Sequence, residues 1–126
     1  MAVAGLNHFN ICAPAELMRR VRDFYVDVIG LTDGYRPDFG IGGHWLYAGD
    51  SPVLHLMERS GDASQERGTA SYLDHVAFTC TGLEEVQKRL ELLQLKFERR
   101  EFPAFGFAQL VLVDPAGLGV ELNFNL

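Results

Sequence analysis

The order of apolar and polar positions predicts a βαβββ unit in the first half of the chain. Residues 5–12 alternate between apolar and polar side chains, which is the period-2 pattern of a half-buried strand. Apolar residues at helical spacing then run from Leu17 to Val28, with Pro14 in the first turn. Gly30 stands where a C-terminal cap is expected. Three extended segments complete the unit, near residues 31–35, 44–48 and 52–58.

The second half of the chain repeats this order after a polar linker, residues 59–71. Residues 73–80 alternate again, and Thr81-Gly82-Leu83-Glu84 has the pattern of a capping box at the start of a helix. Asp114-Pro115-Ala116-Gly117 predicts a turn before the last strand. The strands of this half are expected near residues 95–102, 107–113 and 118–125.

Short motifs recur at a nearly constant offset, which supports a duplication. Leu6-Asn7-His8 returns as Leu73-Asp74-His75, and Val53-Leu54-His55-Leu56 returns as Gly119-Val120-Glu121-Leu122. A half of about 60 residues is marginal as an independent domain, because so short a chain buries too little of its surface. We therefore predict one domain, residues 1–126, that contains two modules, residues 4–58 and 72–126.

Four metal-ligating side chains occupy matching positions in the two copies: His8, His55, His75 and Glu121. If the apolar neighbours in each strand face a helix, parity places all four on the opposite face of the sheet. Neutral imidazoles and a carboxylate bind Zn²⁺, Ni²⁺, Fe²⁺ or Mn²⁺. A surface or hydrogen-bonded role is the simpler explanation for any single histidine, but it does not explain four matching positions. We predict one site for one divalent metal ion, with Glu121 and His55 as candidate catalytic residues.

The same parity predicts which side chains line a cavity beside the metal. The loops of residues 36–43 and 102–106 are rich in Gly and Phe and are candidates for covering the mouth. Aromatic lining favours an apolar or aromatic small molecule, although these aromatic residues would also serve simply to fill the sheet. His44 has the opposite parity, so we expect it to be exposed or hydrogen-bonded outside the site. The predicted pocket residues are Trp45, Tyr47, Gln109, Asn10, Phe39 and Phe105.

Composition and charge narrow the choice of partners. A net charge of −6 disfavours nucleic acid, which attracts a basic face. The chain has no apolar run of the roughly 18 residues that a membrane span needs, and its start shows no signal peptide. Two cysteines do not make a disulfide framework. These features favour a cytoplasmic protein that acts on a small molecule.

The paired units resemble the vicinal oxygen chelate superfamily over nearly the whole chain. The superfamily includes glyoxalase I, methylmalonyl-CoA epimerase, fosfomycin-resistance transferases, extradiol dioxygenases and bleomycin-resistance proteins. The resemblance implies an α+β fold in which two tandem βαβββ modules form a U-shaped mixed sheet around a central cavity that holds the metal. It also implies a homodimer, with each site built within one chain or across two. The motifs that carry it are Leu6-Asn7-His8, Phe24–Leu31, Leu73–Phe78 and Asp114-Pro115-Ala116-Gly117 with Val120-Glu121-Leu122.

The resemblance implies a metal-dependent enzyme that acts on a small oxygenated metabolite, by dioxygenase-like or lyase/isomerase-like chemistry. His55 stands where glyoxalase I carries the Glu that moves the substrate proton, which disfavours glyoxalase I itself. His8, His75 and Glu121 resemble the ligand set of dioxygenases and fosfomycin transferases, but no cationic cluster for a phosphonate is evident. The alternatives are a bleomycin-resistance-type binding protein without catalysis, whose acidic surface attracts cations, and an interaction module with a vestigial site.

Overall fold

The computed structural model describes residues 6–60, 73 and 75–126. It divides the chain into two compact units, residues 1–68 and 69–126. Each unit contains a four-stranded mixed sheet, with strand orders β1-β4-β3-β2 and β5-β8-β7-β6. The predicted α+β class with paired βαβββ modules is therefore confirmed. Most of the predicted linker and Asp74 of the repeated motif lie outside the described residues.

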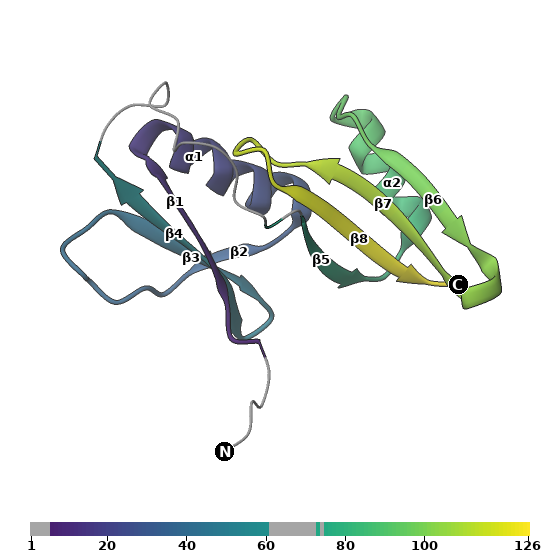
Figure 1. The fold of residues 1–126 in the computed structure, drawn as a ribbon, viewed down its shortest axis with the longest axis horizontal. Coiled ribbons are helices and arrows are strands. Elements are labelled where there is room, and N and C mark those ends of the chain that lie inside the picture. The colour runs from purple at the N-terminus through teal and green to yellow at the C-terminus, as the bar shows by residue number, and fades with distance from the viewer. Residues whose placement is uncertain (1–5, 61–72, 74) are drawn as a thin grey trace, which may run out of the picture. The chain divides into compact units, whose positions relative to one another are not determined.

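In the first unit, β1 and β4 pair in parallel and the other strands pair antiparallel (Figure 1). The helix α1 packs against β1, β3 and β4. The buried side chains Leu54 and Leu56 alternate along β4 with half-buried ones such as His55. The face of the sheet away from α1 therefore carries His55. The elements are β1 Phe9–Pro14, α1 Ala15–Asp23, η1 Phe24–Ile29, β2 Thr32–Gly34, β3 Gly43–Ala48 and β4 Ser51–Arg59.

The helical segment of this unit differs from the prediction in two places. Pro14 is the last residue of β1 and the N-cap of α1, rather than part of the first turn. The helix changes at Phe24 to a π-helical segment that runs through Ile29. Gly30 caps it as predicted: its φ is 95°, and its amide donates to the carbonyl of Tyr25 at 3.0 Å. Glycine adopts this left-handed conformation without the steric cost of a Cβ atom.

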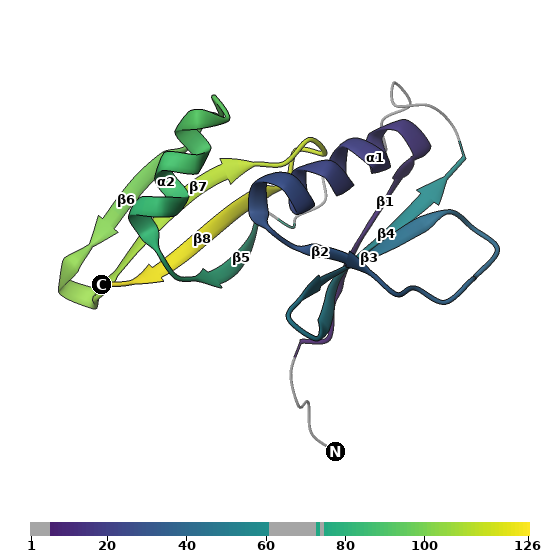
Figure 2. The same cartoon turned by 180° about the vertical axis from the view of Figure 1, so that it is seen from behind.

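In the second unit, β5 and β8 pair in parallel, and α2 runs alongside β6 in both views (Figures 1 and 2). The capping-box prediction was wrong, because Gly82, not Thr81, is the N-cap of α2. Gly82 has a φ of 79°, and no side chain caps the helix. The elements are β5 His75–Cys80, α2 Leu83–Leu92, β6 Glu98–Phe102, η2 Pro103–Phe105, β7 Phe107–Val113 and β8 Gly119–Asn125.

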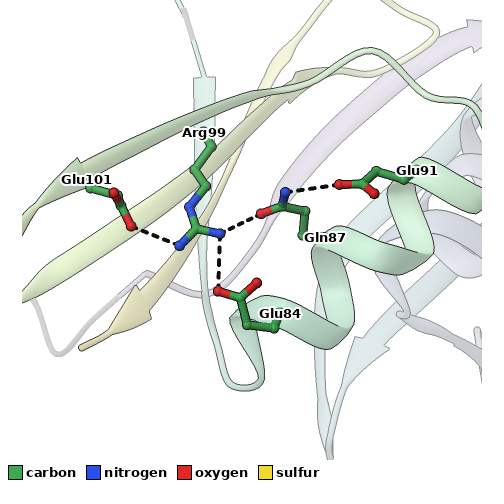
Figure 3. A network of polar contacts seen from close by, with 5 residues as sticks. All are labelled: Glu84, Gln87, Glu91, Arg99 and Glu101. Atoms are coloured by element: carbon green, nitrogen blue, oxygen red, sulfur yellow. Dashed lines mark hydrogen bonds and ion pairs between the residues drawn. The ribbon is translucent and has the colours of Figure 1, made fainter.

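Arg99 joins β6 to α2 and so identifies the face of the sheet that carries the helix (Figure 3). Its Nη1 donates to Gln87 Oε1 at 2.6 Å and to Glu84 Oε1 at 3.2 Å, while Nη2 donates to Glu101 Oε1 at 2.8 Å. Arg99 pairs across the ladder with the buried Leu110, so both side chains point to the α2 side.

The two sheets share one register, which supports the duplication at the level of individual residues. Trp45 pairs with His55 between β3 and β4, and Val111 pairs with Glu121 between β7 and β8. His55 and Glu121 thus occupy equivalent places on the second strand of their sheets. No helix among the described residues is long and apolar enough to span a membrane.

Candidate functional site

In the first unit, the ring of His55 lies between two other rings on the face away from α1. The His8 ring stacks on it with a centroid distance of 3.7 Å and an interplanar angle of 14°. The Trp45 ring stacks at 4.1 Å and 10°. The strands produce this arrangement, because β4 lies between β1 and β3 and places His55 beside Asn10 and Trp45. His8 precedes Asn10 by two residues and therefore shares its side of the sheet.

Hydrogen bonds assign a tautomer to each imidazole of this stack. His55 Nε2 is 3.1 Å from the carbonyl oxygen of Pro52, which can only accept, so Nε2 carries the hydrogen and Nδ1 carries the lone pair. His8 Nδ1 donates to Asn7 Oδ1 at 2.7 Å, which leaves the lone pair on Nε2. Burial and then the neighbouring His8 lower the pKa of His55, and Arg36 adds to this effect. His55 is therefore neutral near pH 7, which is the form that binds a metal.

The other predicted pocket residues of this unit take different positions. Phe39 is exposed, with its ring tilted 42° to that of Trp45 at a centroid distance of 6.1 Å. Tyr47 turns toward β2, where its ring covers Gly34 and its hydroxyl donates to the carbonyl of Tyr35 at 2.6 Å. His44, which we expected outside the site, is hydrogen-bonded to Asp33 Oδ2 at 2.8 Å. That expectation is confirmed.

In the second unit, a histidine and a carboxylate approach each other on the face away from α2. His75 Nε2 lies 3.7 Å from Glu121 Oε1. Gln109 Nε2 donates to Glu121 Oε2 at 3.1 Å, so β7 orients the carboxylate. The side chain of Glu121 is 16% exposed and that of His75 is 45% exposed. The remaining pocket residue predicted in this unit, Phe105, lies in η2 and is exposed.

Each unit by itself supplies a pair of candidate ligands. Among residues 6–60, and likewise among residues 73 and 75–126, no three His, Cys, Asp or Glu side chains gather in a group able to hold a metal ion. The donor chemistry of the pairs, neutral imidazole nitrogen and carboxylate oxygen, suits Zn²⁺, Ni²⁺, Fe²⁺ or Mn²⁺. An imidazole binds a metal in the plane of its ring, so the parallel rings of His8 and His55 do not aim at one ion as they stand. The exposed His8 would have to rotate out of the stack.

Arg36 is a residue of this face that the sequence patterns did not identify. Its guanidinium lies over the ring of Phe39, at 5.1 Å from the centroid, and Nη1 donates to the carbonyl of Ile41 at 3.0 Å. A Cβ atom at Gly43 would clash with the backbone carbonyl oxygen of Leu56 and would come within 2.8 Å of Arg36 Nη2. A glycine within a strand often marks the close approach of other groups, but it does not identify Arg36 as one of them.

Comparisons with known proteins identify the fold. No family model matches the chain, and no curated protein matches it. A putative glyoxalase family protein from Bacillus anthracis is similar in structure, with a TM-score of 0.77, 21% identity, and coverage of 100% of this chain and 98% of that chain. The fosfomycin resistance protein FosX from Listeria monocytogenes has a TM-score of 0.70 and 19% identity, covering 99% and 96%. An antibiotic binding protein from Streptomyces sp. has a TM-score of 0.67 and 16% identity, covering 100% and 99%. The chain has the fold of the vicinal oxygen chelate superfamily, as the resemblance implied.

Proposed function

We propose that the protein is an enzyme that uses one divalent metal ion per site to act on a small, apolar or aromatic, oxygenated molecule. The ligands proposed are His8, His55, His75 and Glu121. One observation carries this proposal: each unit presents a ligand pair on the face opposite the helix, with His8 directly before β1, His75 at the start of β5, and His55 and Glu121 at equivalent places in β4 and β8. A sheet that needed only packing on this face would have no reason to keep these side chains at matched positions.

The residues of each unit suggest a division of roles. When bound, the metal would supply Lewis-acid stabilisation of negative charge on a substrate oxygen. Glu121 is the proposed proton carrier, since the Gln109 amide holds Oε2 and leaves Oε1 facing His75. His55, neutral because its pKa is lowered, is the second acid/base candidate. Trp45 would support the apolar part of the substrate.

The type of reaction follows from the asymmetry of the pairs. The set contains a single carboxylate, which suits dioxygenase-like or lyase/isomerase-like chemistry. A histidine at position 55 argues against glyoxalase I itself, because a bound neutral imidazole is a poor substitute for a displaceable carboxylate base. We infer that the protein is cytoplasmic and forms a homodimer in which the site is built within one chain or across two.

A second candidate function is small-molecule binding without catalysis. The stack of His8, His55 and Trp45 favours it, because these rings already form an aromatic surface without a metal. A similar structure is described as an antibiotic binding protein. This function predicts that ligand affinity survives alanine substitution of all four proposed metal ligands.

Metal titration of untagged protein tests the first proposal. The single tryptophan, Trp45, contacts His55, so its fluorescence reports metal binding directly. We expect one ion per site for at least one of Zn²⁺, Ni²⁺, Fe²⁺ and Mn²⁺ by calorimetry. Glu121→Ala or His55→Ala should weaken the affinity by about 100-fold or more.

His44→Ala is the matched control, because His44 lies on the same strand as Trp45 and is engaged with Asp33 instead. Its affinity for metal should equal that of the unmodified protein. Absence of stoichiometric binding by all four metals would exclude the proposed metal site.

A further inference from the structure

We propose that Arg36 binds an anionic group of the ligand, so that the ligand is an apolar or aromatic molecule bearing an oxyanion such as a carboxylate or phosphonate. The inference rests on the proposed function in one respect, namely that the ligand lies on the face of β3 and β4 that carries Trp45 and His55. It adds a charge requirement and a residue that meets it.

The guanidinium of Arg36 lies on that same face. Gly43 and Trp45 are two residues apart in β3, so their Cα–Cβ directions point to the same side of the sheet. A Cβ atom at Gly43 would clash with the carbonyl oxygen of Leu56 and would also come within 2.8 Å of Arg36 Nη2, so the guanidinium lies beside Gly43. Phe39 links Arg36 to Trp45, because it contacts both residues, through a cation–π contact and a tilted ring contact.

The charge of Arg36 has no carboxylate partner among residues that the structure describes. Other arginines, Arg22, Arg99 and Arg100, form ion pairs with Asp or Glu at 2.8–3.2 Å. Arg36 is half-buried, donates from Nη1 to the Ile41 carbonyl, and has a buried Nε with no hydrogen-bond partner. A partly desolvated cation without a counter-ion is costly, and an anion on this face would offset that cost.

The chemistry of the Arg36 guanidinium determines which class of ligand it would bind. A guanidinium presents several N–H donors in a planar fork, which matches the oxygens of a carboxylate or phosphonate. The rings of Phe39, Trp45 and His55 offer an apolar surface beside it. A ligand that uses both needs a planar or apolar body next to an oxyanion. A purely cationic ligand would be repelled.

The competing explanation is that Arg36 only fastens the loop between β2 and β3. Its bond to Ile41 closes this loop, in which Asp38 Oδ1 also accepts the amide of Gly40 at 2.9 Å. A loop fastener would, when removed, weaken neutral and anionic ligands equally. An anion-binding residue would, when removed, abolish the difference between them.

The test measures affinity for matched probes by amide chemical-shift titration of the metal-free protein in chelator. The probes are benzoate and phenylphosphonate, with benzamide and benzyl alcohol as neutral counterparts. We expect the anions to bind about tenfold more tightly than the neutral probes, as a charge-assisted hydrogen bond would give. Arg36→Gln should remove this preference, and Arg36→Lys should retain part of it.

Arg19→Gln is the matched control, because it changes the net charge equally at an exposed position of α1. It should keep the full preference. If Arg36→Gln does not fold, as judged by its amide spectrum, Arg36→Met preserves the apolar stem and replaces it.

The inference is overturned if the unmodified protein shows no preference for anions, including no binding of any probe, or if Arg36→Gln, or Arg36→Met in its place, keeps the full preference. Failure of the metal proposal is a separate outcome. A preference for anions without metal binding would support the role of Arg36 and exclude only the metal site.

Discussion

The two sheets have the same strand register, but their faces away from α1 and α2 carry different side chains. The first unit presents a stack of three rings and a guanidinium with no carboxylate partner among the described residues, while the second presents a carboxylate held by an amide and approached by a histidine. Duplication has thus preserved the backbone positions and changed what they carry. Under the two proposals, the first face would bind an apolar body with an anionic group, and the second would supply the negative charge that a metal ion needs.

The largest losses of stability are expected from substitutions in the buried side chains that face the helices, where the two units are alike. Leu56 and Leu122 occupy equivalent positions and are 1% and 2% exposed. Replacing either by alanine should lower the free energy of unfolding by about 2–5 kcal/mol, through lost burial and a residual cavity. Chemical denaturation measures both. A loss below 1 kcal/mol in only one variant would show that the two units do not share one packing pattern.

The turns before the last strand of each unit differ, and the second should be the more sensitive. Asp114 is buried, and its Oδ1 accepts the amides of Ala116 and Leu118 at 2.8 and 2.9 Å. Asp114→Ala should cost about 1–3 kcal/mol of unfolding free energy, because two donors lose their acceptor. Asp50, in the two-residue turn of the first unit, is exposed, so Asp50→Ala should be nearly neutral in the same denaturation experiment. Equal losses would contradict this difference.

Protonation of His55 is expected to lower the stability of the folded protein by a smaller amount. Burial and His8 lower its pKa below the ordinary value of 6.5, so the folded state prefers the neutral ring. The resulting stability is fully present above pH 6.5 and is lost as the pH falls through the lowered pKa. A proton NMR titration of the imidazole of metal-free protein should give a value below 6.5.

His8→Ala should raise the pKa of His55 without restoring 6.5, because burial, the larger cause, remains. A pKa at or above 6.5 in the unmodified protein would contradict the stacked arrangement.

Strand alternation predicted much of the fold, because a half-buried strand must direct every second side chain to the core. It located β7 at Phe107–Val113 and the ends of β8 within a residue. The capping ability of a side chain was a poorer guide to where a helix begins. Thr81 has the side chain of a cap, but the left-handed conformation of Gly82 determines where α2 begins.

Arg36 could not be placed from alternation, because it lies in a loop. Its position depends on a hydrogen bond to the Ile41 carbonyl and on the absence of a side chain at Gly43, neither of which has a periodic signature. Parity and the repeat offset predicted that His55 shares a face with Trp45, and Glu121 with Gln109, but they did not predict the contacts within these two pairs. Ring stacking and the tautomers depend on side-chain positions in three dimensions, which no sequence pattern specifies.

The central proposal is that one metal ion is bound by both ligand pairs, His8 with His55 and His75 with Glu121. The most direct test is metal calorimetry of two double variants, His8→Ala with His55→Ala and His75→Ala with Glu121→Ala, on protein whose fold is verified by its amide spectrum. The account predicts that both variants lose stoichiometric binding, since neither pair suffices alone. Binding of the unmodified affinity and stoichiometry by either double variant would contradict it.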